Sequence, residues 1–175
     1  MEIDYLNVIL KNIPKNASIL DLGCGTGEPI AQFFIEKGHN VTGVDAAKAM
    51  LNLCKERFPQ ATWVLEDIRT IDLKTEFDVV IAWDSFFHLN HDDQRKMFKI
   101  FQTHIKRLGI LVFTSGPSHN EVYSNMSGYE FYHASLDTEE YQHLLKQYDF
   151  RVIVHKIEDP NCGDHTVWVA QSIKE

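Results

Sequence analysis

Residues 19–28 read ILDLGCGTGE, and this stretch decides the fold. An apolar run ends in the acid Asp21, three glycines then alternate with small residues, and a helix-compatible segment follows over residues 29–37. This order predicts a buried strand, a tight turn and a helix N-terminus, because glycine permits positive φ and close approach of a ligand to the backbone. The free N–H groups and the positive dipole end of the helix favour an electron-rich ligand at the turn.

The glycine spacing separates two classes of ligand. A dinucleotide-binding fold requires G-x-G-x-x-G, with the third glycine allowing close packing of helix on strand. Here the spacing is G-x-G-x-G, and Glu28 stands in the place of the last glycine. Together with Asp21, Glu28 brings negative charge to the turn, which suits a ligand with a cationic end better than a pyrophosphate. A nicotinamide-dependent dehydrogenase is therefore disfavoured.

The stretch resembles motif I of the class I S-adenosylmethionine-dependent methyltransferases. The resemblance implies that S-adenosylmethionine is the cofactor and that residues of this motif bind it: Asp21, Gly23, Cys24, Gly25 and Gly27. A glycine turn without a ligand is the alternative interpretation.

A second acid, Asp45, ends the apolar segment 41–45, about 20 residues beyond the glycines, at the spacing from which a carboxylate reaches the ribose of an adenosine ligand. A carboxylate can accept two hydrogen bonds from a vicinal diol. The resemblance assigns this role to Asp45, with Ala46 beside it in the cofactor site. The alternative role is to cap the helix expected over residues 46–58, and the two can coexist because a cap needs one oxygen.

The third and fourth strands, expected over residues 61–65 and 77–83, supply further candidates. The resemblance implies that Asp67 binds the adenine amino group and that Ile68 packs on the ring. The alternative interpretation of Asp67 is an exposed loop acid, and Glu66 is a rival for the adenine role. Because ligands of open α/β sheets lie beyond the carboxyl ends of the strands, Trp83, Asp84 and Ser85 are expected to face the transferable methyl group.

The candidate catalytic residues are Asp84, His88, His119 and His133. A base is needed only if the acceptor loses a proton. Asp84 is the best polar candidate, whereas His88 either touches the substrate or bonds the backbone. His119 and His133 belong to segment 115–136, which is expected to be irregular and to cover the substrate, because long loops in compact domains are usually functional.

Composition favours one domain over residues 1–175. The chain has a mass of 20.2 kDa and a formal net charge of −8, which argues against broad binding to nucleic acid or anionic membranes. Three scattered cysteines do not form a disulfide framework or zinc motif, and no metal is expected. The start lacks signal-peptide features and no apolar run approaches the roughly 20 residues of a membrane span, so a cytoplasmic location is expected.

The remaining pattern completes an α/β sandwich. A helix over residues 92–107, a strand over 109–114 and a helix over 137–148 precede two strands, 150–157 and 166–171, that follow each other without a helix and so predict an antiparallel hairpin. The resemblance implies a seven-stranded, mostly parallel sheet of order 3-2-1-4-5-7-6, with the last strand antiparallel and helices on both faces in a three-layer arrangement.

The predicted activity is transfer of a methyl group from S-adenosylmethionine to a small-molecule acceptor by in-line displacement. Metal-assisted catechol-type transfer is disfavoured because Ser115 and Gly116 replace its second acid, and the Asn-Pro-Pro-Tyr signature of amino-group methylation of nucleic acids or glutamine is absent. A non-catalytic module that binds S-adenosylmethionine or S-adenosylhomocysteine and regulates a partner is the alternative. The acceptor atom and the oligomeric state stay open.

Overall fold

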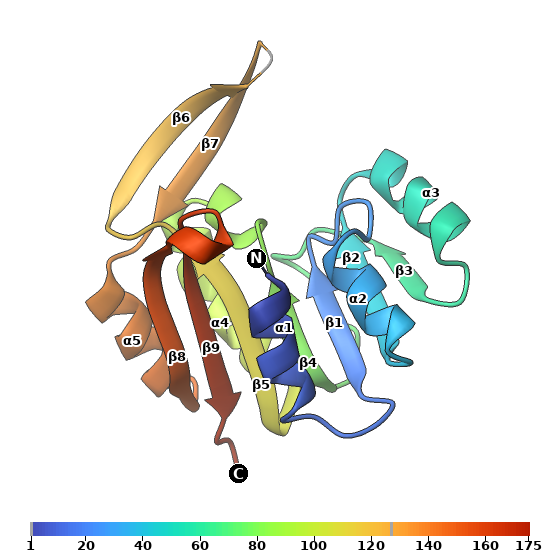
Figure 1. Ribbon diagram of the computed structural model, residues 1–175. Coiled ribbons are helices and arrows are strands. Elements are labelled where there is room, and N and C mark those ends of the chain that lie inside the picture. The colour runs from blue at the N-terminus through green and yellow to red at the C-terminus, as the bar shows by residue number, and fades with distance from the viewer. Residues whose placement is uncertain (1, 127) are drawn as a thin grey trace.

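A seven-stranded sheet with helices on both faces forms the body of the protein in a computed structural model, which describes residues 2–126 and 128–175 (Figure 1). The helices are α1 Ile3–Leu10, α2 Ile30–Glu36, α3 Lys48–Arg57, α4 His91–His104 and α5 Thr138–Gln147, with short 3-10 helices η1 Phe86–His88 and η2 Pro160–Cys162. The sheet strands are β1 Ser18–Leu22, β2 Asn40–Asp45, β3 Thr62–Leu65, β4 Phe77–Ala82, β5 Ile105–Ser115, β8 Phe150–Asp159 and β9 His165–Ser172. Two further strands, β6 Asn120–Met126 and β7 Tyr129–Ser135, form a separate hairpin.

The predicted α/β class is confirmed. The sheet has the order β3-β2-β1-β4-β5-β9-β8, with β1 to β5 parallel and β9 antiparallel to both of its neighbours. If the hairpin strands are left out and the sheet strands are numbered 1 to 7 along the chain, their order across the sheet is 3-2-1-4-5-7-6. Among the described residues, no helix combines the length and the apolar character that crossing a membrane requires.

The nearly continuous apolar strands are explained by burial on both sheet faces. In β4, Val80 and Ala82 belong to a core cluster with α4 and α5, whereas Val79 and Ile81 belong to a second cluster with α1 and α2. Alternate residues of β4 thus pack into the cores on opposite faces of the sheet. This packing fixes the position of the residues at the edge of the sheet.

The segment expected to be irregular, 115–136, is largely a β-hairpin, which corrects the sequence prediction. Strands β6 and β7 pair antiparallel from Asn120 opposite Ser135 to Met126 opposite Tyr129, and the hairpin projects away from the sheet (Figure 1). Its Ser, Asn and Gly content is typical of a loop, but the paired strands satisfy each other's backbone groups.

The helix predicted over residues 92–107 ends earlier, at His104. Strand β5 begins at Ile105, which pairs with Phe77, and the register then shifts so that Ile110 pairs with Val79. Leu108 in this irregular stretch has φ of +64°. The bulge therefore absorbs residues that the apolar pattern assigned to the end of the helix.

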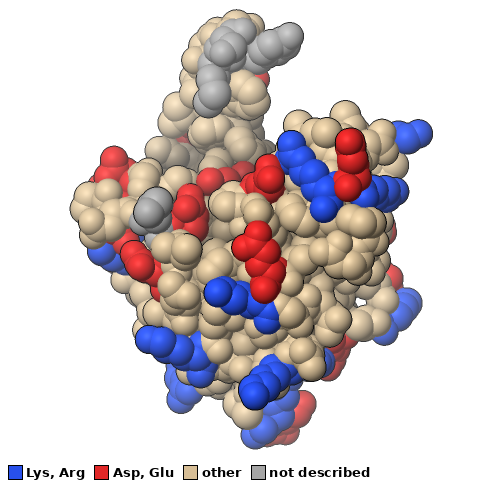
Figure 2. All heavy atoms as spheres, turned by 45° about the vertical axis from the view of Figure 1, so that its right-hand side comes forward, with Lys and Arg blue, Asp and Glu red and all other residues tan. Residues whose placement is uncertain are grey.

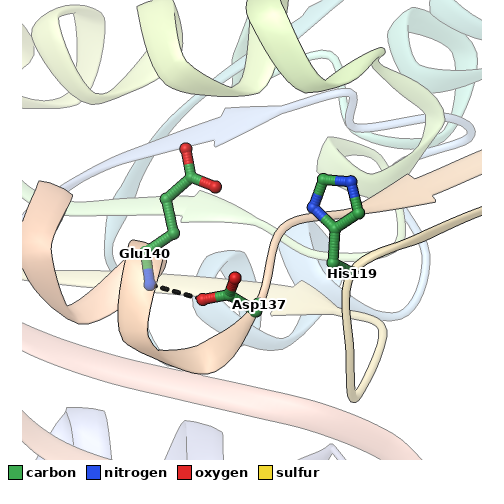
Figure 3. A group of neighbouring side chains, drawn as sticks. All are labelled: His119, Asp137 and Glu140. Carbon is green, nitrogen blue, oxygen red and sulfur yellow. Dashed lines mark hydrogen bonds between the residues drawn. The ribbon is translucent and has the colours of Figure 1, made fainter.

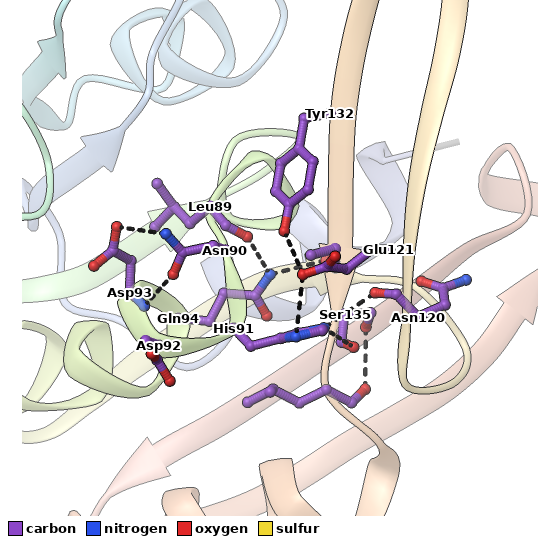
Figure 4. Close-up of polar contacts among 12 residues, drawn as sticks. Leu89, Asn90, His91, Asp92, Asp93, Gln94, Asn120, Glu121, Tyr132 and Ser135 are labelled. Carbon is purple, nitrogen blue, oxygen red and sulfur yellow. Dashed lines mark hydrogen bonds and ion pairs between the residues drawn. The ribbon is translucent and has the colours of Figure 1, made fainter.

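Polar side chains hold the base of the hairpin against the start of α4 through hydrogen bonds (Figure 4). Gln94 is fully buried, and its Nε2 donates to the carbonyl oxygens of Leu89 and Ala134, each at 2.8 Å. Its Oε1 accepts from the Tyr141 hydroxyl at 2.6 Å. His91 Nε2 lies 3.1 Å and 3.0 Å from the carbonyl oxygens of Asn120 and Ser135, one in each hairpin strand.

Gln94→Leu should lower the free energy of unfolding by roughly 2–4 kcal/mol, because each buried polar group left without a partner costs about 1–3 kcal/mol. Urea denaturation measures this loss, and hydrogen exchange should show faster exchange of the β7 amides. Gln142→Leu, at an exposed position on α5, is the matched control and should leave both unchanged. Equal effects of the two substitutions would show that Gln94 does not hold the hairpin.

Candidate active site

The glycine turn after β1 and the end of β2 are joined by hydrogen bonds. The Gly25 N–H donates to Asp45 Oδ2 at 2.9 Å, and the amides of Gly23 and Cys24 donate to the Val44 carbonyl at 2.8 Å and 3.1 Å. Asp45 Oδ1 accepts from the Ala47 amide at 2.7 Å, where α3 begins. The expected closeness of the two motifs is therefore present. The alternative prediction that Asp45 caps the helix is wrong, because α3 begins at Lys48 with Ala47 as its N-cap residue, and Asp45 bonds the Ala47 amide instead.

Two glycines of the turn meet different requirements. Gly23 has φ of +77°, and a Cβ added to it would lie 2.3 Å from the Ser85 Cβ, so this position needs glycine for packing. Gly25 has φ of +52°, and a Cβ there would meet nothing within 4 Å. The backbone at Gly25 thus borders open space, as a ligand site requires.

Two cavities meet at this turn. The large cavity has a volume of about 910 Å³, and its lining includes Gly25, Asp45, Ala46, Asp67 and Ile68. The tail cavity has a volume of about 210 Å³, and its lining includes Asp21, Cys24, Glu28 and Trp83. Three residues line both cavities: Gly23, Gly25 and Asp84. All the predicted cofactor residues except Gly27 line one of the two cavities. Gly27 instead packs against aromatic side chains, since a Cβ added to it would lie 3.2 Å from the rings of Phe58 and Trp63.

The cavities are acidic. The carboxylates that line the large cavity are Asp45, Asp67, Asp84, Asp93 and Glu121. Arg69 is the basic residue in this lining, and its guanidinium pairs with Asp67 and Asp93. Figure 2 shows acidic side chains gathered below the projecting hairpin, with many Lys and Arg side chains along the lower part of that face. This distribution favours a ligand with positive charge and opposes a polyphosphate.

The Asp21 carboxylate is the group in these cavities whose charge most requires a cationic partner. Burial and the nearby charge of Asp45 raise the pKa of this carboxyl to about 7. The side chain lines the tail cavity, and no described residue donates a hydrogen bond to it. Since a buried charge needs a partner, an ammonium or sulfonium group in the tail cavity would fit this carboxylate. The residues present therefore fit the methionine end of S-adenosylmethionine.

Asp84 is paired with a histidine that the sequence analysis did not identify. His165 Nε2 lies 2.7 Å from Asp84 Oδ1, and His165 Nδ1 lies 2.6 Å from the carbonyl oxygen of Cys162. The hydrogen bond to Asp84 raises the pKa of His165 to about 9. His165 is therefore an imidazolium at neutral pH that donates at both nitrogens, and it holds the carboxylate in place.

The three histidines predicted to be catalytic lie in different places. His88 lines the large cavity, and its Nδ1 lies 3.0 Å from the carbonyl oxygen of Tyr132, so the backbone-bonding interpretation is confirmed for it. His133 lines a third cavity, of about 350 Å³. Burial, with a smaller contribution from His88, lowers the pKa of His133. His119 does not line these cavities but stacks on His91, with ring centroids 4.2 Å apart.

His119 also belongs to a group of metal-ligand type with Asp137 and Glu140, whose ligand atoms all lie within 4.8 Å of one another (Figure 3). Both acids have structural partners. Asp137 Oδ1 accepts from the Glu140 amide at 2.7 Å and so caps α5, and Glu140 Oε1 accepts from Arg95 Nε at 2.6 Å. Asp137 and Glu140 therefore have structural roles, one at the start of α5 and the other in a contact between α4 and α5.

The sheet order is that of the class I methyltransferase fold, and the two cavities lie at the carboxyl edge of its parallel strands. The family model described as "Methyltransferase domain" matches residues 19–109, more than half of the chain, and the chain belongs to this family. The family is S-adenosylmethionine-dependent, and its cofactor is S-adenosylmethionine.

Individual relatives agree with this assignment. The chain is 37% identical over 108 residues to the putative methyltransferase YqeM of Bacillus subtilis, covering 58% of this chain and 43% of that protein. It is 27% identical over 111 residues to the dTDP-4-amino-2,3,4,6-tetradeoxy-D-glucose N,N-dimethyltransferase of Saccharopolyspora spinosa, covering 62% and 44%. The chain thus spans less than half the length of these two relatives. An amino pentose methyltransferase from Micromonospora echinaspora has the same fold, with a TM-score of 0.75, 20% identity and coverage of 97% and 89%.

Asp84→Asn should lower the pKa of His165 from about 9 toward the ordinary value of about 6.5. Because the folded-state pKa is raised, the pair stabilises the protein fully below about pH 6.5, and this stabilisation is lost as pH rises through about 9. NMR titration of the imidazole signals and denaturation at several pH values measure both effects. Asp164→Asn, which removes a neighbouring acid, is the control, and titration of wild-type His165 near 6.5 would contradict the pairing.

Proposed function

We propose that this chain binds S-adenosylmethionine across the large and tail cavities and methylates a small-molecule acceptor. The observation that carries the proposal is that Gly23, Gly25 and Asp84 line both cavities. A ligand with its adenosine in the large cavity and its amino-acid end in the tail cavity has its central atom beside these residues. That atom is the sulfonium in S-adenosylmethionine.

Each part of the donor has a candidate partner. Asp45 retains lone pairs for the ribose hydroxyls beside its two backbone bonds, and Asp67 and Ile68 border the space for the adenine. Arg69 holds the Asp67 carboxylate through two nitrogens, which orients it. Asp21 is the partner for the ammonium group, because it is buried and lines the tail cavity.

The bound donor supplies an already activated methyl group. The protein then contributes alignment of the two reactants, which can lower such a barrier by roughly 7–11 kcal/mol. Asp84, held by His165, borders the place where the two donor cavities meet and can accept a hydrogen bond from an acceptor N–H or O–H group.

A small molecule is the acceptor class that the charges support. Carboxylates dominate the donor cavities, and the chain has a net charge of −8, so a nucleic acid would meet repulsion. Segment 115–136 is the proposed cover of the acceptor, since Tyr123 and Tyr132 of the hairpin line the large cavity. A purely regulatory binder would not need the additional cavity of about 350 Å³ on the other face of this hairpin.

Asp45→Ala should weaken binding of S-adenosylhomocysteine at least tenfold, since loss of charge-assisted hydrogen bonds costs about 1.4 kcal/mol or more. Titration calorimetry measures the affinity, and thermal unfolding checks that the variant is folded. Glu66→Ala is the matched control, because Glu66 is not among the residues that line the large cavity. Unchanged affinity in a folded Asp45→Ala variant would refute the ribose assignment.

The affinity of the wild-type protein for S-adenosylmethionine should rise as pH increases through about 7, because the donor ammonium needs the ionised form of Asp21. Calorimetry between pH 5.5 and pH 8.5 measures this dependence. Asp21→Asn should bind more weakly and lose the dependence. If wild type and variant show the same pH profile, Asp21 does not hold the ammonium.

A further inference from the structure

The hairpin stands between two cavities because side chains alternate along its strands. Glu121, Tyr123 and Tyr132 line the large cavity. Val122 and its cross-strand partner His133 line the third cavity, which we call the hairpin cavity. The lining of the hairpin cavity also includes Phe87, Ser115, Asn120, Asp164 and His165.

The Asp84–His165 ion pair connects the hairpin cavity to the donor site. Asp84 lines the large and tail cavities, and His165 lines the hairpin cavity. The 2.7 Å contact between Asp84 Oδ1 and His165 Nε2 therefore joins a residue of the large and tail cavities to a residue of the hairpin cavity. A molecule in the hairpin cavity lies next to the side-chain pair that borders the sulfonium position.

The lining of the hairpin cavity is aromatic and offers no unpaired positive charge. The ring centroids of Phe87 and His133 lie 5.2 Å apart, and those of Phe87 and His165 lie 6.5 Å apart. Among the described lining residues there is no Lys or Arg, the imidazolium charge of His165 is matched by Asp84, and Asp164 adds a carboxylate. The Asn120 amide forms no side-chain hydrogen bond with the described part of the chain, so it can bind a polar ligand group.

We propose that the hairpin cavity binds the methyl acceptor and that the acceptor is a planar aromatic or heteroaromatic small molecule without a negative charge. Aromatic rings pair with such a molecule in stacked or edge-to-face arrangements, and a few polar groups fix its orientation. The cavity volume of about 350 Å³ limits the acceptor to a small molecule. This inference rests on the proposed function, because it names the acceptor side of the same reaction.

The test uses the full chain saturated with S-adenosylhomocysteine and four probes: indole, phenol, benzoate and phenyl phosphate. Imidazole NMR signals of His133 and His165 report binding in the hairpin cavity. Indole and phenol should shift both signals saturably, at least tenfold more tightly than the two anions. Equal binding of the anions would overturn the ligand class. Absence of saturable binding, or shifts at His88 with none at His133 and His165, would overturn the site.

Val122→Trp should fill the hairpin cavity and weaken indole binding at least tenfold while leaving the affinity for S-adenosylhomocysteine unchanged. Ser124→Trp is the matched control, because it places the same ring on the same face of β6, one pleat nearer the hairpin tip. Indole binding equal in the two variants would overturn the site, and the wild-type titration decides it if Val122→Trp does not fold. Failure of the wild-type protein to bind S-adenosylhomocysteine would refute the proposed function instead.

Discussion

The hydrogen bond from the Gly25 amide to the Asp45 carboxylate is the constraint on which the site depends. It closes the glycine turn against the end of the neighbouring strand, and it requires the register in which Leu22 lies beside Val44. A shift of that register by one residue would turn the Asp45 side chain to the other face of the sheet. Packing of both sheet faces fixes the register, so the core determines the geometry of the donor site.

Much of this arrangement follows from local sequence signals. Segments 19–22 and 77–82 are apolar apart from Asp21 and Asp78 and show no alternation, which predicts strands buried on two faces. Both segments are confirmed as strands of the parallel sheet. The carboxyl ends of neighbouring parallel strands share one edge. The closeness of the glycine turn and Asp45 could therefore be predicted before any contact was known.

The hairpin and His165 could not be predicted in the same way. The side chains of β6 whose burial the structure describes, residues 120–125, are largely exposed on both faces, and apolar and polar residues do not alternate along the strand. Its base is fixed by Gln94 and His91, which lie on another element. His165 obtains its role from Asp84, a residue distant in the chain, and nothing in the residues around His165 indicates that pairing.

The distribution of charge links these features. Asp21 and Asp45 lie close enough for the charge of Asp45 to raise the pKa of Asp21, so the donor site holds like charges at a cost in stability. The charge of Asp84 is offset by its ion pair with His165, and the charge of Asp67 is offset by its ion pair with Arg69. Asp21 is left without such a partner among the described residues. In the proposed complex a cationic donor supplies the compensating charge, and its binding energy then includes relief of the repulsion between Asp21 and Asp45.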